Sequence, residues 1–454
     1  MPQFKPSVFA LSPHSSAHSL QTELQYVRHA ILTLCTGMRP LTRELLLRSA
    51  IVCGALLLTI LLLEFAVRAL GEADADGQFK FGGYDLPPYT LPLSELRTEV
   101  ETYLSSRDQA TLIPDPLTGW TYKPNSTREN GNFTINGAGL RSRREYALPP
   151  ADDTLRIALF GDSFVAGDEV KDNEVWGYHL ERLLRQAGIR AEALNFGVGG
   201  YGMGQAFLRW KHKGKDYIVI FVFQAENLDR NVNIFRILYG QGAIYSKLRF
   251  TLEKGGAAGL ALINSPALPP EAIMDALETF DSHPLAVYEA YYRGREFTSP
   301  LWKLSRLAGL LYAAREENYP AEPPSQRYGP RSERASLGMA IVEAFAIDAA
   351  GSGAEFIVLH LPRKDHFRDF HAGKQAPWRS LLNHFQKEYH FINAEAFLGA
   401  EYTDDSYYQP DWHYGPEINL RIAEAVAADL LACIENETCE LARFQDLRDI
   451  KTLD

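Results

Sequence analysis

Short apolar runs that alternate with helical patterns constrain the fold of this 454-residue chain more than any other feature. The segments between them carry apolar residues at helical spacing, as in Trp176, Leu180 and Leu184 before Gly188. Strands that alternate with helices are typical of βαβ units, which join into a parallel sheet. The sequence therefore predicts an α/β domain with a central parallel sheet. Its expected strands are the runs 155–160, 191–196, 216–223, 354–362 and 390–398.

A second feature is an uncharged apolar stretch near the amino end. Residues 49–63 carry no charge, and a helix that continues to Leu70 has the roughly 20 residues that a membrane span needs. Basic residues precede this stretch and acidic residues follow it, which predicts a cytoplasmic amino end. We expect a cytoplasmic segment over 1–48, a single transmembrane helix over 49–70 in the cytoplasmic membrane, and a periplasmic domain beyond it.

Alternatives to this anchor remain open at the level of sequence. A signal peptide would be cleaved at the A-x-A-like site 73–75, but Glu64 and Arg68 lie between the apolar run and that site. The other alternative is a buried core helix, which the leucine and isoleucine on every face disfavour. Met38 lies just before the basic flank and is a second candidate for the start of the chain, beside Met1.

The rest of the chain divides by composition. Residues 71–109 are expected to form a tether that leaves the membrane, with a short amphipathic helix within it. The main domain is expected over 110–454, and it begins with a β-rich lead-in over 110–150. Residues 236–335 interrupt the alternation of strands and helices. An insertion of this size between sheet strands usually forms a lid or a binding face.

Charge and cysteine content exclude some classes of partner and leave others open. The formal net charge of −11 argues against a nucleic-acid partner, because phosphate binding needs a basic surface. The four cysteines form no CxxC metal pattern. Cys433 and Cys439 either close a small disulfide loop, as an oxidising compartment would allow, or are two unrelated thiols.

Suggestive residues follow the expected strands at their carboxyl ends, where parallel α/β sheets form their sites. GDSF (161–164) follows the first strand, GVGGYG (197–202) the second and QAEN (224–227) the third, and DWH (411–413) precedes the last helix. In this order, these four pieces resemble the SGNH (GDSL) hydrolase superfamily over about 115–432. The stretches TGWTYKPN and INGAGLR, before the first strand, resemble the membrane-anchored bacterial branch of that superfamily.

The resemblance implies a flavodoxin-like three-layer sandwich and a serine mechanism. Ser163 would be the nucleophile, and His413 would be its general base and later the general acid toward the leaving alcohol. Asp411 would orient the His413 imidazole and stabilise its charged form. Many members of the family place this pair three residues apart, whereas here the spacing is two. Asp404 and Asp405 are reserve candidates, although solvated loop residues are the simpler interpretation.

The resemblance also implies an oxyanion hole for the tetrahedral intermediate. Its donors would be the backbone N–H groups of Ser163 and Gly200 and an asparagine side chain after the third strand. Without a gap, Glu226 occupies the asparagine position, and an ionised carboxylate would repel an oxyanion. Either Asn227 takes that place, or Glu226 has another role, or one donor is missing.

Other patterns favour structural interpretations. GVGGYG also matches a dinucleotide-binding motif, but it follows the second strand and lacks the acidic residue that such a site places further on. His360, His366 and His371 mix a strand end with a charged loop, so no metal site and no cofactor is expected. Trp412, between the two proposed catalytic residues, is the best candidate for stacking on a sugar ring.

Together, these patterns predict a membrane-anchored serine esterase that removes O-acyl groups from envelope or secreted carbohydrate. The same residues also suit a polysaccharide O-acetyltransferase, in which a sugar hydroxyl replaces water as the acyl acceptor. A non-catalytic envelope protein that binds glycan is a third hypothesis, and Glu226 is its best support. Partners are accordingly an acylated carbohydrate or other ester, and the lipid bilayer through 49–70.

Overall fold

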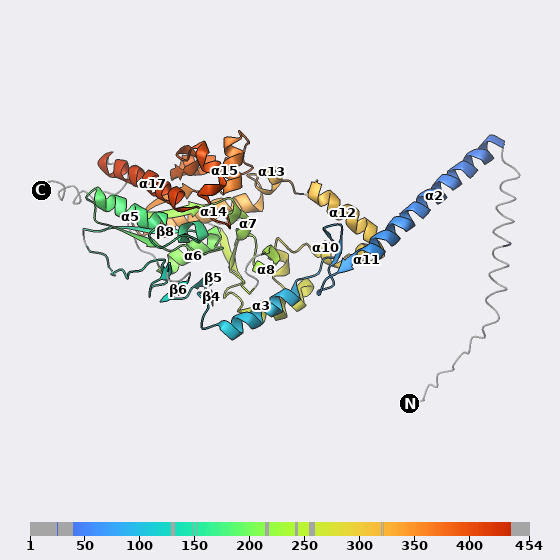
Figure 1. Ribbon diagram of the computed structural model, residues 1–454, viewed down its shortest axis with the longest axis horizontal. Coiled ribbons are helices and arrows are strands. Elements are labelled where there is room, and N and C mark those ends of the chain that lie inside the picture. The colour runs from blue at the N-terminus through green and yellow to red at the C-terminus, as the bar shows by residue number, and fades with distance from the viewer. Residues whose placement is uncertain are drawn as a thin grey trace, which may run out of the picture.

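The computed structural model describes residues 40–436 together with residue 25. The gaps within this range are 129–131, 148, 152, 214–217, 241–243, 254–258, 319 and 321. Figure 1 shows the helix α2 (Pro40–Leu70), which projects away from the body of the molecule. Within α2, residues 43–70 are long and apolar enough to cross a membrane, and little of that stretch is buried.

A five-stranded parallel sheet forms the centre of the body. Its strands are β8 (Leu155–Phe160), β9 (Ala191–Asn195), β10 (Ile218–Phe223), β13 (Glu355–His360) and β14 (His390–Asn393). The spatial order is β14-β13-β10-β8-β9, and every neighbouring pair is parallel. The protein is thus a mixed α/β structure, and this order of five strands is consistent with a flavodoxin-like fold.

Helices cover both faces of this sheet. α5 (Trp176–Gln186) and α17 (Pro416–Asn436) pack together on one face. α6 (Met203–Lys213), α14 (Glu333–Gly351) and α16 (Arg379–Glu388) cover the other. In Figure 1, α17 lies next to α5 along one side of the body. The three-layer arrangement follows from the fully buried central strand β10, which needs apolar cover on both faces.

The alternation of side chains along β8 divides the interior into two cores. Leu155, Ile157 and Leu159 belong to the core under α5 and α17. Ala158 and Phe160 belong to the core under α6 and α14. Successive strand residues point to opposite faces, so one apolar strand supplies both cores.

The remaining elements lie outside the central sheet. The segment after α2 contains β1 (Glu72–Ala73), β2 (Phe79–Phe81), β3 (Tyr84–Leu86) and α3 (Leu93–Ser106), and the lead-in contains β4 (Leu112–Asp115), β5 (Gly119–Tyr122), β6 (Ser126–Arg128) and β7 (Phe133–Ile135). Short helices of the body are α4 (Ser163–Ala166), α7 (Glu226–Asn231) and α15 (Lys364–His371). The insertion contains α8 (Arg236–Tyr239), β11 (Arg249–Leu252), β12 (Leu260–Ile263), α9 (Pro270–Glu278), α10 (Gly294–Thr298), α11 (Pro300–Leu304), α12 (Arg306–Asn318) and α13 (Pro324–Arg327). Single 3₁₀ turns lie at Phe280–Ser282, Ala286–Tyr288, Ala394–Ala396, Ala400–Thr403 and Asp405–Tyr407.

The segment 71–109, expected to be a tether, is folded against the insertion. β1, β2 and β3 form an antiparallel sheet, and β3 packs on α12. Leu86 of β3 and Ala313 of α12 enclose Val67 of α2 in a small core. Turn-forming residues in this segment indicate the turns, but not the partner on which the intervening strands pack.

The lead-in and the insertion share a third core, which lies beside the loop after β9. It contains Trp120, Tyr122 and Tyr201, together with Phe280 of the insertion and Phe235, the residue directly before the insertion. The Trp120 indole N–H donates to the Gly199 carbonyl at 2.9 Å, and the Gly199 N–H donates to the Tyr122 hydroxyl at 3.1 Å. The lead-in therefore fixes the backbone of the glycine-rich loop.

The cysteines differ in state. Cys53 in α2 is a free thiol, whereas Cys433 in α17 is disulfide-bonded. Cys35 and Cys439 lie outside the described residues, as do Met1 and Met38. The pairing of Cys433 with Cys439 and the start of the chain stay predictions.

The core between the sheet and α14 yields a stability prediction. Phe345 is fully buried, and its ring contacts Phe160, Phe207 and Trp210 among others. We expect Phe345→Ala to lower the free energy of unfolding by about 3–5 kcal/mol, because it leaves a cavity among aromatic rings. Chemical denaturation of the full-length protein measures this change.

The matched control is Ile347→Ala, two residues further along the same helix, where the side chain is 58% exposed. Its effect should stay within about 0.5 kcal/mol. Equal effects of the two substitutions would contradict the assignment of Phe345 to the core.

Candidate functional site

Ser163 lies at the point where β8 turns into the short helix α4. Gly161 makes the turn possible, because a Cβ there would come within 2.6 Å of the Val165 side chain. Ser163 begins α4 directly after Asp162, the N-cap residue, and it is only 6% exposed. The central sheet therefore holds this serine in a fixed place at the carboxyl end of a central strand.

Asp162 fixes the surroundings of Ser163. Its Oδ1 accepts a hydrogen bond from the Phe164 backbone N–H at 3.0 Å, as an N-cap does. Its Oδ2 accepts from Asn227 Nδ2 and from Arg230 Nη1, each at 2.9 Å. Asp162 is 1% exposed, so this charge is fully paired within the protein. One buried carboxylate thus joins the loop after β8 to α7, the helix after β10.

The structure brings His413 to the same place. Its ring lies against Phe164, the neighbour of Ser163, with centroids 4.9 Å apart. His413 Nδ1 lies 2.5 Å from Asp411 Oδ1, and the His413 backbone N–H also donates to that oxygen at 3.2 Å. The intervening Trp412 has a left-handed φ of 74°, which lets the two-residue spacing close into this turn. The contact between Asp411 and His413 is therefore present despite the short spacing.

No hydrogen bond joins Ser163 to His413 within the described part of the chain. This separation does not exclude a base–nucleophile pair, because catalytic hydrogen bonds are often long before substrate binds and shorten in the complex. The His413 imidazole packs on Phe164, the residue next to Ser163, and its Nδ1 is directed to the Asp411 carboxylate.

Sequence reasoning missed a second carboxylate at this site, Glu169. It has a left-handed φ of 68°, and its Oε2 accepts a hydrogen bond from the Asp411 backbone N–H at 3.3 Å. The same oxygen lies 3.8 Å from His413 Nδ1. The only sequence signal is its place in the loop after Ser163, since Glu169 and Asp411 are far apart along the chain. Glu169, Asp411 and His413 are also the one group in the described part of the chain that offers three close ligands for a metal ion.

Two backbone N–H groups in the loops after β8 and β9 have no hydrogen-bond partner among the described residues. Within the described residues, neither the Ser163 N–H nor the Gly200 N–H donates a hydrogen bond, whereas Gly199 donates to Tyr122. Gly200 has a left-handed φ of 77°, and Arg236 Nη2 lies 3.4 Å from where its Cβ would be. Backbone N–H groups without a partner are the kind of donor from which an oxyanion hole can be built.

The side chain of Asn227 is engaged elsewhere. Its Nδ2 donates to Asp162 and to the Tyr201 carbonyl, and its Oδ1 accepts from the Gln224 backbone N–H. Asn227 is 3% exposed, so a substrate does not reach this amide in the described arrangement. Asn227 joins the loops of the site rather than presenting a free donor.

Glu226 is held between two cations. Its carboxylate accepts hydrogen bonds from Arg230 Nη2 at 2.9 Å, from the Tyr239 hydroxyl at 3.0 Å and from Arg363 Nη1 at 3.1 Å. Burial raises the pKa of Glu226, but Arg230 and Arg363 outweigh this effect, so the net pKa lies below its ordinary value. Glu226 is therefore ionised, and its charge is compensated by these cations.

The remaining sequence candidates lie apart from this cluster. His360 is buried with Nδ1 2.9 Å from Asn393 Oδ1, while His366 packs on Trp378 and His371 on Phe367. Among the described residues these three histidines form no ligand cluster. Asp404 caps the turn at Ser406, and Asp405 pairs with Lys364 and Arg368. Trp412 is 54% exposed, and Lys364 Nζ lies 3.9 Å from the centroid of its ring.

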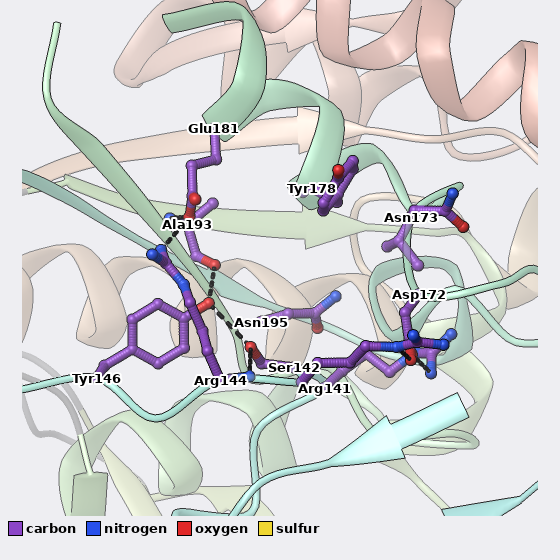
Figure 2. A pocket seen from close by; sticks show the side chains of 13 residues that line it. Arg141, Ser142, Arg144, Tyr146, Asp172, Asn173, Tyr178, Glu181, Ala193 and Asn195 are labelled. Carbon is purple, nitrogen blue, oxygen red and sulfur yellow. Dashed lines mark hydrogen bonds and ion pairs between the residues drawn. The ribbon is translucent and has the colours of Figure 1, made fainter. Parts of the chain in front are cut away.

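A cavity of about 420 Å³ lies beside the edge strand β9, and Ser163 and His413 do not line it. Figure 2 shows its polar lining, in which Arg144 pairs with Glu181 and Tyr146 reaches the Ala193 carbonyl. Arg141 in the same lining pairs with Asp172. Arg143 pairs with the same Asp172, so the lining holds three arginines and two carboxylates, most of whose charge is compensated within the protein.

Comparisons with known proteins assign no family. No family model matches the chain, and no curated protein matches it. One solved structure aligns with a TM-score of 0.32 and 15% identity, covering 62% of this chain and 97% of its own. Another, TesA, aligns with a TM-score of 0.30 and 11% identity, covering 65% of this chain and 99% of its own. Likeness at this level carries no argument about activity.

The buried pairing of Asp162 yields the prediction for this site. We expect Asp162→Ala to destabilise the protein by about 3–5 kcal/mol, because it leaves the Arg230 charge buried without one of its partners. Urea denaturation measures the change. Asp369→Ala removes an exposed ion pair with Lys374 and should cost less than about 1 kcal/mol. A loss at Asp162 no larger than at Asp369 would refute the structural role.

Proposed function

We propose that the protein is a membrane-anchored serine esterase of the SGNH type, which removes O-acyl groups from envelope or secreted carbohydrate. The observation that carries the proposal is the grouping at the carboxyl edge of the sheet. Ser163 follows a central strand, two unpaired backbone N–H groups lie in its loop and in the next one, and the His413–Asp411 pair packs beside it.

The chemistry follows from these positions. His413 accepts the Ser163 hydroxyl proton as the serine oxygen attacks the ester carbonyl, and a tetrahedral oxyanion forms. Collapse of this intermediate breaks the bond to the alcohol, which takes the proton from His413 and leaves an acyl-serine. Water then attacks the acyl group with His413 as base, the bond between the carbonyl carbon and the Ser163 oxygen breaks, and His413 returns the proton to that oxygen as the acid is released. Asp411 holds Nδ1 of the ring and stabilises its charged form during both steps.

The oxyanion is stabilised by the backbone N–H groups of Ser163 and Gly200, and the Arg236 charge lies near Gly200. Burial and then the Arg230 charge lower the pKa of Arg236 to about 10, so this guanidinium is still charged at neutral pH. A nearby cation favours the developing negative charge, whereas Glu226 is already compensated by Arg230 and Arg363. In this proposal the positive charge takes the place of an asparagine donor.

The proposed substrate class is supported by Trp412, and the proposed location is supported by α2. Trp412 is an exposed aromatic ring directly beside His413, which suits stacking on a sugar. α2 has the length and hydropathy of a membrane span, and Arg43 and Arg48 precede its uncharged stretch. These features support an extracytoplasmic esterase that acts on acylated carbohydrate near the membrane.

A non-catalytic glycan-binding protein is the second candidate. One observation favours it, namely that the Asn227 amide is engaged by Asp162 and Tyr201, so in the described part of the chain this side chain offers no donor to a substrate. Loss of one side-chain donor typically costs about 10²–10³ in rate, which slows an esterase without abolishing its reaction. The two candidates therefore differ in whether Ser163 reacts at all.

The first experiment tests the nucleophile. We expect the full-length protein in detergent to hydrolyse p-nitrophenyl acetate and to be labelled by a fluorophosphonate at Ser163. Ser163→Ala should lose both reactions, and His413→Ala should lose turnover. The matched control is Ser105→Ala at an exposed position of α3, which should keep both. A folded wild type that neither turns over nor takes the label would favour the glycan-binding candidate.

The second prediction concerns the two carboxylates. Asp411→Ala should lower kcat by about 10²–10⁴, because the charged form of His413 loses its nearest partner. Glu169→Gln should cost about 10- to 100-fold through misplacement of the Asp411 backbone.

A double-mutant cycle separates positioning from an independent role. If Glu169 acts through Asp411, the double variant should lose less than the product of the two single losses. Strict additivity of the two effects on kcat would contradict this coupling.

A further inference from the structure

The insertion carries exposed apolar residues next to the end of α2. Leu301 is 51% exposed and Leu304 is 76% exposed. Their spacing of three residues places both on one side of the short helix α11. We refer to α11 and α12, residues 300–318, as the α11–α12 segment. Figure 1 shows this segment beside the end of α2 that joins the body.

The α11–α12 segment is bonded to α2 through Glu64. The Glu64 carboxylate accepts hydrogen bonds from the backbone N–H groups of Arg306 and Leu307, each at 2.9 Å, and from the Ser305 hydroxyl at 2.8 Å. A charged side chain of α2 therefore caps the amino end of α12. In addition, Arg68 Nη2 donates to the Leu304 carbonyl at 3.1 Å. Leu304 consequently lies at the level of residues 64–68 of α2.

The length of the uncharged run in α2 indicates how far residues 64–68 lie from the centre of the bilayer. The uncharged residues 49–63 extend only about 22 Å at 1.5 Å per residue. A hydrocarbon core of about 30 Å needs roughly 20 residues, which reaches Arg68 when it is counted from residue 49. The outer boundary of the hydrocarbon therefore falls at Glu64–Arg68, the level of Leu304.

The charges at this boundary are compensated. Arg68 Nε lies 2.5 Å from Glu64 Oε1, and the other hydrogen bonds of Glu64 come from the amino end of α12. Paired and hydrogen-bonded charges at the end of a span are tolerated where isolated ones are costly. Trp302 and Tyr312 contact each other in the same segment, and such side chains are enriched at membrane interfaces.

We propose that the α11–α12 segment rests in the outer interface of the bilayer, with Leu301 and Leu304 in contact with the acyl chains. The occupant of this apolar surface is lipid because the surface continues that of the membrane-spanning α2 at the depth where the hydrocarbon ends. The exposed Lys303 between the two leucines lies near the headgroup phosphates. This inference rests on α2 spanning a membrane and is independent of the chemistry of Ser163.

The test uses the full-length protein in phosphatidylcholine nanodiscs with Cys35 and Cys53 replaced by serine. Single cysteines at Leu304, Leu62 and Leu117 carry an NBD fluorophore, and lipids with a shallow doxyl group quench it. Leu62 lies in α2 and is 60% exposed, whereas Leu117 is 45% exposed on the lead-in. We expect quenching at position 304 to be at least about twofold greater than at position 117, because the label lies in the interface.

Two outcomes would overturn the inference. Equal quenching at positions 304 and 117, with strong quenching at position 62, would place the segment in water while α2 spans the membrane. Absence of quenching at position 62 would overturn the span and the inference together. Labelling of Leu301→Cys in the same way guards against a local disturbance at position 304. The fluorophosphonate reaction of Ser163 reports on the proposed function separately, in the same samples.

Discussion

The buried carboxylate of Asp162 is the interaction on which the rest of the site depends. Its charge is out of contact with water, and burial of a charge is tolerable only where partners compensate it. Asp162 meets this need by bonding to Phe164, Asn227 and Arg230, which belong to the loops after two neighbouring strands. The position of Ser163 is therefore determined by a network that spans the sheet edge, rather than by its own loop alone.

The same network explains how a glutamate, Glu226, is accommodated at the position where the sequence resemblance implied an asparagine. Because Asn227 bonds to Asp162, it is not free to act as a donor for substrate. Arg230, the other partner of Asp162, also bonds to Glu226, and Arg363 adds a second positive charge. The Glu226 carboxylate is thus compensated in part by Arg230, which also compensates the buried charge of Asp162. The result is a site whose positive charge comes from buried arginines.

The sequence predicts the features of this protein that depend on periodicity and on strand ends. Short apolar runs that alternate with helical patterns predicted the parallel strands, and the residues after those runs predicted where Ser163 and Gly200 lie. Glu169 was not predictable, because its contact with Asp411 joins distant parts of the chain and depends on a left-handed φ that no local pattern marks. The folding of 71–109 was equally hidden, since Leu86 is buried in a cluster with Val67 of α2 and Ala313 of the insertion, which are distant in the sequence.

Aromatic packing continues through the insertion to the core beside the glycine-rich loop. Aromatic rings contact in sequence from Phe297 to Tyr292 at 4.5 Å, to Phe280 at 4.7 Å and to Phe235 at 5.2 Å. Phe235 shares its core with Tyr201, the neighbour of Gly200. Close-packed interiors resist deformation, so this packing holds the insertion in a fixed orientation relative to the glycine-rich loop. Glu64, by joining α2 to α12, therefore helps to set how the apolar helix is oriented relative to the loop that holds Ser163.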